Sequence, residues 1–289
     1  MDCLIRLAQT DATLGNLGAN LETHLAEIER ATRDGVDAIV FPELSLTGYF
    51  LKDQTAEVAL TLDASEIEAL RERSQHISII VGFVERANDG RVYNSLALLE
   101  DGAVKHVHRK VHLVTYGMFE ESRDLAAGDR FDVFESKHGR LGFLICEDLW
   151  HVDGAYLYFL DGADAIIVAS ASPGRGVTEG PGLESSETCN KLQDALALFF
   201  RTWVLMVNRV GWEDGIVFGG ASRAVDPFGA ETGAPLGLDP DRLDVRVTSE
   251  ALDRARIQTP LRRDEKPWIL THALARRMGL GLREQDDTK

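Results

Sequence analysis

An apolar run that ends in a cysteine and two acidic residues decides the fold of this chain: Leu141-Gly142-Phe143-Leu144-Ile145-Cys146-Glu147-Asp148-Leu149-Trp150. A short run of this kind, punctuated by glycine and closed by acidic residues, is typical of a buried strand that opens into a turn. A thiol at the exit of a strand can reach a cleft while the sheet holds its backbone. Cysteine is also among the most buried residue types, so Cys146 on its own would more often be an inert core residue. Two further segments favour a functional role.

A carboxylate follows a second strand-like run, at residues 37–43. Pro42 cannot donate a backbone hydrogen bond to a sheet, so the strand should stop there and present Glu43 at the turn. Glu43 is flanked by apolar residues, where a charge is costly unless it is paired. We therefore expect Glu43 to have a partner.

A lysine lies near the end of a third segment, in which residues 104–113 alternate as in an edge or half-buried strand. For an isolated Lys110 the simplest interpretation is a surface cation. The loop that follows, residues 114–123, is neither regular nor low in complexity, and loops of this kind on a rigid scaffold often hold functional residues.

Together the three segments resemble the signature segments of the nitrilase, or carbon-nitrogen hydrolase, superfamily, in order and in spacing. They are Phe-Pro-Glu-Leu-Ser-Leu-Thr-Gly-Tyr around Glu43, Arg-Lys-Val-His-Leu around Lys110, and Ile-Cys-Glu-Asp-Leu-Trp around Cys146. The similarity runs from Leu4 to about Asp226 and includes residues 92–95 and 208–222. Within the superfamily the chain is most similar to the glutaminase domain of glutamine-dependent NAD synthetases.

The residue types point to nucleophilic catalysis. A free cysteine has a pKa near ~8.5, so little of it is thiolate at neutral pH and a base must take its proton. We assign Cys146 as the nucleophile and Glu43 as the general base. Lys110 would stabilise the tetrahedral oxyanion, together with the backbone N–H that follows Cys146. The resemblance implies the same three roles.

The resemblance also implies a second glutamate that orients the pair, after the lysine. Glu120 and Glu121 are both candidates, and the family's Phe-x-Glu-x-Arg pattern, matched to residues 119–123, selects Glu121. The alternative for Glu121 is an exposed loop carboxylate that pairs with Arg123.

Aromatic and polar residues near these segments are candidates for substrate binding, although packing in the core or on the surface is an alternative for each. They are Tyr49, Tyr116, Phe119, Trp150 and Ser172. Relatives that cleave N-carbamoyl amino acids often have arginines three and four residues after the cysteine. Leu149 and Trp150 stand there in this chain, which argues against that substrate class.

Composition excludes several other functions. Lys and Arg total 31 against 47 Asp and Glu, a formal net charge of −16, which opposes binding to nucleic acid or anionic membranes. No apolar run approaches the ~18 residues of a membrane span, and residues 1–4 lack the basic start of an export signal. Three cysteines, one of them assigned as the nucleophile, fit a reducing cytoplasm.

His106, His108 and His112 alternate on one strand, but no second cluster completes a metal site, and we expect no metal or cofactor.

Strand-like and helical runs alternate along the chain, which indicates an α/β fold. The resemblance implies a four-layer αββα sandwich of the nitrilase type. We expect residues 1–289 to form a single carbon-nitrogen hydrolase domain, with a C-terminal extension from about residue 250 and a polar tail at 283–289. Family members usually pair across helices, so a homodimer or larger homo-oligomer is expected, with the helical run that begins near Ala155 at the interface.

These observations predict a thiol amidohydrolase that releases ammonia from a small amide, glutamine-like or another primary amide, through a cysteine thioester. The Ser-Gly-Gly-x-Asp-Ser loop of the ATP-dependent part of NAD synthetases is not found in this sequence. The chain would then act alone as an amidase or supply ammonia to a separate synthetase. A hypothesis of a different class is a non-catalytic scaffold or binding subunit, which would not need all three of Glu43, Lys110 and Cys146. Nitrile hydrolysis uses the same three groups, but the surrounding sequence is amidase-like.

Overall fold

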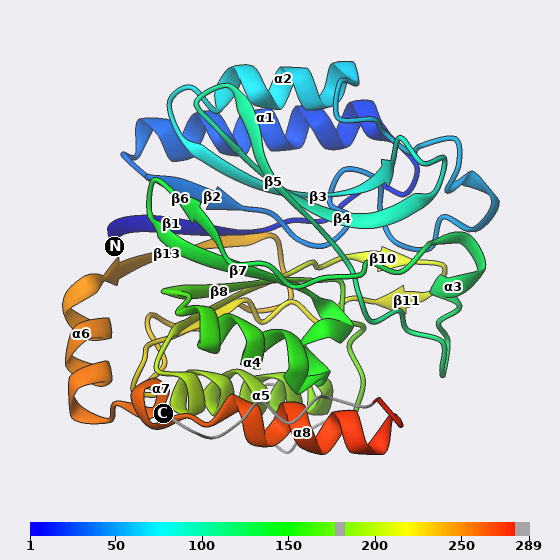
Figure 1. The fold of residues 1–289 in the computed structure, drawn as a ribbon. Coiled ribbons are helices and arrows are strands. Elements are labelled where there is room, and N and C mark those ends of the chain that lie inside the picture. The colour runs from blue at the N-terminus through cyan, green and yellow to red at the C-terminus, as the bar shows by residue number, and fades with distance from the viewer. Residues whose placement is uncertain (177–182, 281–289) are drawn as a thin grey trace.

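Two β-sheets lie face to face, with helices on the outer side of each, in the computed structural model of the protein (Figure 1). The structure describes residues 1–176 and 183–280. The four layers confirm the αββα sandwich that the sequence predicts.

The first sheet has six strands in the order β13-β1-β2-β3-β4-β5, in which β1, β2 and β3 are parallel and the other neighbours are antiparallel. Their bounds are β13 (Asp241–Thr248), β1 (Asp2–Gln9), β2 (Ala38–Val40), β3 (Ser78–Arg86), β4 (Val92–Glu100) and β5 (Ala103–Arg109). Helices α1 (Leu17–Arg33) and α2 (Ser65–Arg73) cover its outer face through side chains such as Ile28 and Leu70.

The second sheet has five strands in the order β12-β9-β8-β7-β6, of which β7, β8 and β9 are parallel. Their bounds are β12 (Arg223–Val225), β9 (Trp203–Asn208), β8 (Ala165–Ser170), β7 (Gly139–Ile145) and β6 (Phe134–Ser136). Helices α4 (Val152–Asp161) and α5 (Glu184–Phe200) pack on its outer face, where Tyr158 and Ala197 are buried.

The main core lies between the sheets. Ile5 and Leu96 of the first sheet belong to one buried cluster with Phe143, Ile167 and Leu205 of the second. Burial of this apolar surface is the principal force that holds the two sheets together. The ends of strands from both sheets are therefore fixed relative to one another, and the site described below depends on that.

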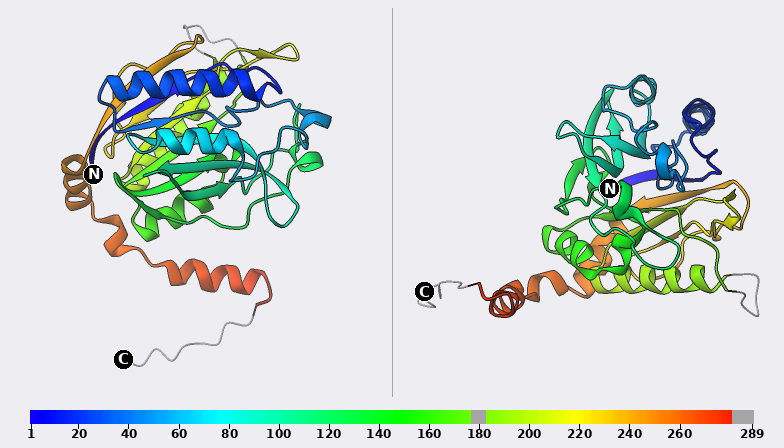
Figure 2. Two further views of the ribbon diagram at one scale, coloured as in Figure 1. Left: turned by 90° about the horizontal axis from the view of Figure 1, so that it is seen from above. Right: turned by 90° about the vertical axis from the view of Figure 1, so that its right-hand side faces the viewer.

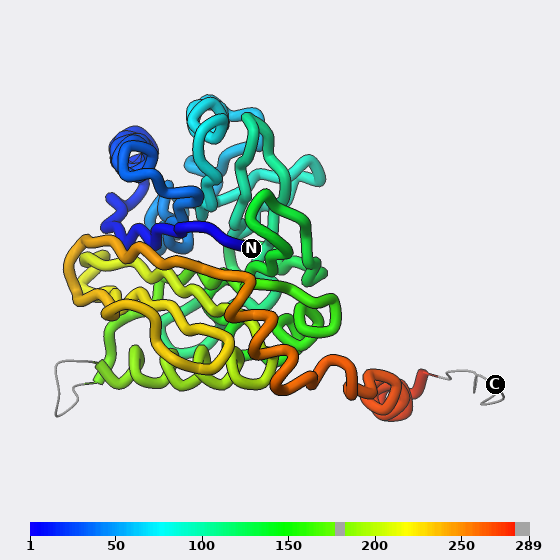
Figure 3. The backbone as a smooth tube through the Cα atoms, turned by 90° about the vertical axis from the view of Figure 1, so that its left-hand side faces the viewer, coloured from blue at the N-terminus to red at the C-terminus, as the bar shows by residue number. Residues whose placement is uncertain are grey.

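The remaining elements are short connections between the strands, and the helices that follow β13. They are η1 (Lys52–Gln54), α3 (Glu121–Asp124), η2 (Cys146–Trp150), β10 (Trp212–Glu213), β11 (Ile216–Val217), α6 (Ser249–Gln258), α7 (Leu261–Asp264) and α8 (Pro267–Arg277). Helix α6 still packs on the edge of the sandwich, where Leu252 joins the main core, whereas α8 lies well away from the sheets (Figures 2 and 3). The tail predicted at 283–289 falls outside the described residues. Of the helices in the described ranges, none has the length and apolar character needed to cross a bilayer.

Candidate active site

Segments that leave the two sheets bring the predicted catalytic residues together. Glu43 follows β2, Lys110 directly follows β5, and Cys146 opens η2 directly after β7. Strand β2 stops at Val40, ahead of Pro42, as the missing donor of proline requires. The base and the cation thus come from the six-stranded sheet and the nucleophile from the five-stranded sheet.

Lys110 lies between two carboxylates. Its Nζ is 2.8 Å from Oε1 of Glu43 and 2.7 Å from Oε1 of Glu121, and the side chains are 0%, 0% and 5% exposed, respectively. We call these three residues the catalytic cluster, after the role that the sequence predicts for them. A buried charge is stable only when it is paired and hydrogen-bonded, and here each charge has a partner of opposite sign.

Further donors fix both carboxylates. Asn94 donates to Oε1 of Glu43 at 2.7 Å, and the backbone N–H of Ala171 donates to Oε2 at 2.7 Å. The Tyr49 hydroxyl donates to Oε1 of Glu121, whose Oε2 accepts the backbone N–H of Val114 at 2.9 Å. Neither carboxylate can rotate without losing several hydrogen bonds.

The cluster also sets the protonation states. Burial raises the pKa of Glu43, with a smaller contribution from the negative charge of Glu121 that Lys110 opposes. Burial alone would lower the pKa of Lys110, but Glu43 and Glu121 outweigh it and the net shift is well upward. Lys110 therefore stays an ammonium, and Glu43 is a stronger base than a surface glutamate.

Cys146 occupies a strained turn. Its φ of 47° lies in the left-handed region, which a residue other than glycine seldom adopts. The side chain is partly accessible, and its Sγ lies 3.8 Å from the Ser172 hydroxyl. Burial raises the pKa of the Cys146 thiol, with a further contribution from Glu43, and Lys110 only partly opposes the shift. The resting residue is a thiol, so a nucleophilic role for Cys146 would require a base.

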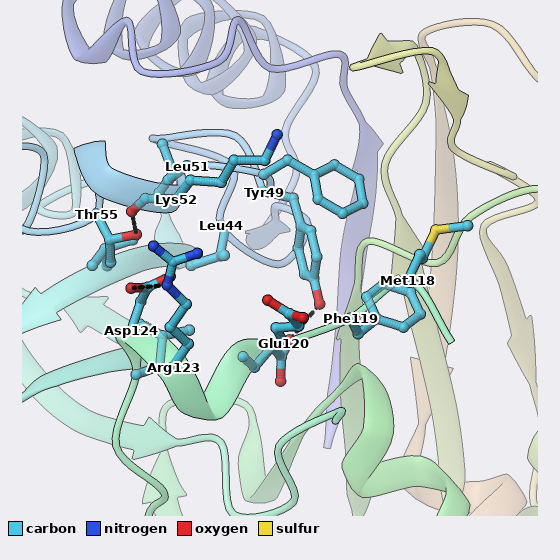
Figure 4. A pocket seen from close by; sticks show the side chains of 14 residues that line it. Leu44, Tyr49, Leu51, Lys52, Thr55, Met118, Phe119, Glu120, Arg123 and Asp124 are labelled. Carbon is cyan, nitrogen blue, oxygen red and sulfur yellow. Dashed lines mark hydrogen bonds and ion pairs between the residues drawn. The ribbon is translucent and has the colours of Figure 1, made fainter. Parts of the chain in front are cut away.

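Two of the predicted substrate residues, Tyr49 and Phe119, line a pocket of about 150 Å³ beside Glu121 (Figure 4). Their rings meet edge to face, with centroids 5.9 Å apart. Since the Tyr49 hydroxyl donates to Glu121, Tyr49 also supports the catalytic cluster, a role that the sequence does not predict. Cys146 is not among the lining residues, so this pocket reaches the site through Glu121 and not through the nucleophile.

The other candidates lie nearer the nucleophile or the surface. Ser172 is the neighbour of Cys146 given above, and its N–H donates to Asn208 at 2.9 Å. Tyr116 is 57% exposed, and its hydroxyl lies 3.1 Å from both oxygens of the Glu147 carboxylate. Trp150, 48% exposed, ends η2 and has no hydrogen bond or ring contact to Cys146 within the described residues.

Asn94, Glu147 and Asp148 belong to the site although the sequence did not single them out. Asn94 lies in the similar stretch 92–95, and Glu147 and Asp148 lie in the signature segment around Cys146, but the sequence assigns none of the three a role. Glu147 is 8% exposed and Asp148 is fully buried. The cost of burying an unpaired charge, which was applied to Glu43, would have identified both.

The three histidines of residues 106–112 contact rings or carboxylates, and His108 and His112 share Phe131 as a neighbour. His106 stacks on Phe134, His108 contacts Asp148, and His112 stacks on His151. In the described ranges, no group of three or more His, Cys, Asp or Glu side chains is arranged to hold a metal ion.

Comparison with known proteins gives one consistent result. Residues 4–258 match the model of the carbon-nitrogen hydrolase family. The chain is 29% identical over 225 residues to a glutamine-dependent NAD(+) synthetase of Acinetobacter baylyi, covering 78% of this chain and 40% of that protein. It is 33% identical over 229 residues to an (R)-stereoselective amidase of Pseudomonas, covering 78% and 77%. A carbon-nitrogen hydrolase structure from Helicobacter pylori superposes with a TM-score of 0.82 at 23% identity, covering 95% and 99%. The chain spans about two fifths of the length of the synthetases that it matches.

Proposed function

The chain belongs to the carbon-nitrogen hydrolase family and is an enzyme of that class, and from this premise we propose that it hydrolyses a small primary amide through a Cys146 thioester and releases ammonia. The observation that supports the proposal best is the catalytic cluster beside a strained, partly accessible cysteine. Similarity to the Pseudomonas amidase over most of both chains favours an amide substrate.

The first half-reaction forms the thioester. Glu43 takes the thiol proton as Sγ of Cys146 attacks the amide carbonyl carbon. Lys110 and the backbone N–H that follows Cys146 stabilise the oxyanion. Glu43 then gives the proton to the leaving nitrogen, the C–N bond breaks, and ammonia departs.

The second half-reaction repeats these roles with water. Glu43 takes a proton from water as its oxygen attacks the thioester carbonyl, and the tetrahedral oxyanion forms at the same place. The C–S bond breaks, the thiolate recovers the proton from Glu43, and a carboxylic acid leaves. Glu121 would keep Lys110 beside both reacting groups throughout.

Two charged side chains, Glu147 next to Cys146 and Arg175 beside Phe119, favour an amide that also has the charges of an amino acid. Glu147 offers a nearly buried carboxylate directly after Cys146, held by the Tyr116 hydroxyl. Arg175 lies over the ring of Phe119, with its guanidinium carbon 5.5 Å from the ring centroid. A carboxylate and a guanidinium suit an α-ammonium and an α-carboxylate, respectively. We therefore place glutamine-like ω-amides ahead of simple aliphatic amides.

The test is ammonia release across a substrate panel, with Cys146→Ala as the blank. The panel holds glutamine, asparagine, aliphatic amides, N-carbamoyl amino acids and nitriles. We expect Cys146-dependent turnover that is fastest with glutamine-like amides. Turnover only with aliphatic amides would refute the amino-acid preference, and silence across the panel would refute the free-standing amidase.

Two alternative functions predict that the chain alone releases no ammonia from any substrate of the panel. The similarity to NAD(+) synthetases favours an ammonia-supplying glutaminase subunit, which would become active when a synthetase partner is added. A non-catalytic scaffold would stay silent with any partner, and its Cys146 would show no reaction with an amide substrate.

We also propose that the chain forms a homodimer or larger homo-oligomer through α4 and α5. Val152 and Leu157 of α4 are 68% and 42% exposed, and Phe199 of α5 is 66% exposed. Sedimentation velocity should show an assembly that Leu157→Asp weakens. A monomer at high concentration would refute this proposal. A cytoplasmic location is proposed with it, because Cys146 must stay reduced.

A further inference from the structure

Asp148 lies between the segments that present the nucleophile and the cation. It is two residues after Cys146, within η2, and is 0% exposed. We propose that Asp148 is a positioning residue, which holds Cys146 of one sheet at a fixed place relative to Lys110 of the other. This inference rests on the proposed function, because it assumes that the two residues act together.

One carboxylate oxygen binds the segment of Lys110. Oδ1 of Asp148 accepts the backbone N–H groups of Val111 at 3.1 Å and of His112 at 2.8 Å. These are the two residues that follow Lys110. The Lys110 backbone itself is anchored to Asn94 and Gly128 at 2.9 and 2.7 Å. The main chain is therefore held on both sides of the catalytic lysine.

The other oxygen binds the turn of Cys146. Oδ2 of Asp148 accepts the backbone N–H of Ile145 at 3.1 Å and lies 3.1 Å from Nε2 of His108. The bond to Ile145 closes the turn in which Cys146 has its positive φ. Strained backbone of this kind persists only where the surroundings fix it. His108, 3% exposed on β5, adds a contact to the strand that ends at Arg109, directly before Lys110.

The chemistry of these contacts requires a carboxylate. Both oxygens accept backbone N–H groups, so an asparagine would direct its NH₂ at one pair of donors in either orientation. A buried donor without an acceptor is costly, and the turn or the lysine segment would have to move to avoid it. Asparagine, although nearly equal in shape, should therefore separate the two catalytic segments.

The readout should not need the amide substrate. Cys146 can be alkylated by chloroacetone, which has no amide bond, and the rate against pH reports whether Glu43 assists the thiol. We expect Asp148→Asn to slow this alkylation ~10²-fold, the scale of a misplacement of about 1 Å. Its pH profile should become that of an unassisted buried thiol, whose alkylation rate rises only above the ordinary cysteine pKa of ~8.5.

Asp153→Asn is the matched control. Asp153 also pairs with a histidine, His112, at 3.1 Å, but its side chain is 53% exposed and it lies outside the contacts above. Its alkylation profile should equal that of the unmodified protein. An equal loss in this control would overturn the proposal, as would an Asp148→Asn protein that is folded by circular dichroism and reacts within about threefold of the unmodified rate.

If Asp148→Asn does not fold, His108→Leu decides the question. It removes one of the four contacts and keeps apolar bulk against Phe131. A roughly tenfold slower alkylation supports the proposal, and an unchanged profile overturns it. Because alkylation needs no amide, a failure of the proposed function leaves this result interpretable. Silence on the amide panel with a clear effect of Asp148→Asn would refute the substrate and keep the positioning role.

Discussion

The catalytic cluster and the outer part of the site differ in how firmly their charges are held. Glu43, Lys110 and Glu121 are buried, and each makes several hydrogen bonds. Outside them, Tyr116 is 57% exposed and Glu147 is held by that one phenol hydroxyl, with His151 nearby. We call Tyr116, Glu147 and Arg175 the rim. The difference teaches that the fold fixes the cluster more firmly than the rim, which supports our proposal that the chemistry depends on the cluster and the choice of substrate on the rim.

The largest effect should come from removal of the proposed nucleophile, on which the cluster and the rim would both act. Cys146→Ala should lower turnover to background, a loss on the order of 10⁴-fold or more, with an unchanged thermal unfolding curve. Ammonia release and circular dichroism measure the two quantities. Full activity of this variant would refute the proposed mechanism. The cluster and the rim could then no longer be compared as a catalytic and a substrate-binding region.

Next is the cation of the catalytic cluster. Lys110→Ala should lower kcat ~10²–10³-fold, the scale of losing an oxyanion donor. Because it leaves two buried carboxylates without a cation, it should also lower the free energy of unfolding by about 3–5 kcal/mol in urea titrations.

Lys52→Ala is the matched control for Lys110, since Lys52 pairs with Asp214 and is 66% exposed. Its stability should stay within about 0.5 kcal/mol of the unmodified protein. If both lysines prove equally important, burial is not what distinguishes the cluster.

The rim should affect affinity more than chemistry. Glu147→Gln should raise KM for a glutamine-like amide ~10–10²-fold, the worth of a hydrogen bond to a charged group, with little change in kcat. An aliphatic amide serves as control, because it lacks the ammonium that Glu147 would bind. A fall in kcat for both substrates would place Glu147 in the cluster and remove the distinction.

The smallest effect is an upward shift of the acidic limb in the dependence of kcat/KM on pH. Burial raises the pKa of Glu43 above the ordinary 4.5 of glutamate. The base must be ionised, so kcat/KM should rise with pH through that raised pKa and fall up to ~10-fold per unit below it. Rate profiles from pH 4 to 9 would show the limb. A limb at or below 4.5 would mean that Glu43 is not the base or is not desolvated.

Much of the fold and of the cluster could be predicted from the sequence, because both depend on local patterns. Pro42 and the acidic residues after Cys146 mark strand ends, and strand ends are where the catalytic groups lie. Strand β13 was not predicted, although Leu243, Val245 and Val247 alternate inward along it. Strand β13 pairs with β1, which sets Asp2 opposite Thr248. These residues lie far apart in the sequence, so no local sequence pattern indicates the pairing.

The contacts that support the cluster could not be predicted for the same reason. The Tyr49 hydroxyl meets Glu121, 72 residues away in sequence, and the Asp148 carboxylate meets Val111, 37 residues away. The sequence shows only that Tyr49 has an aromatic ring and that Asp148 has a carboxylate. Only the folded arrangement of segments that lie far apart in the sequence decides what they touch.

The sharing of Lys110 between two carboxylates has a consequence for the influence of salt. Two anions and one cation give the resting catalytic cluster one excess negative charge. When Glu43 accepts the thiol proton and the oxyanion forms, that excess is conserved and only moves a short distance. Mobile ions screen poorly inside a buried site. The chemical step should therefore be nearly independent of ionic strength, even though the chain as a whole bears a formal charge of −16.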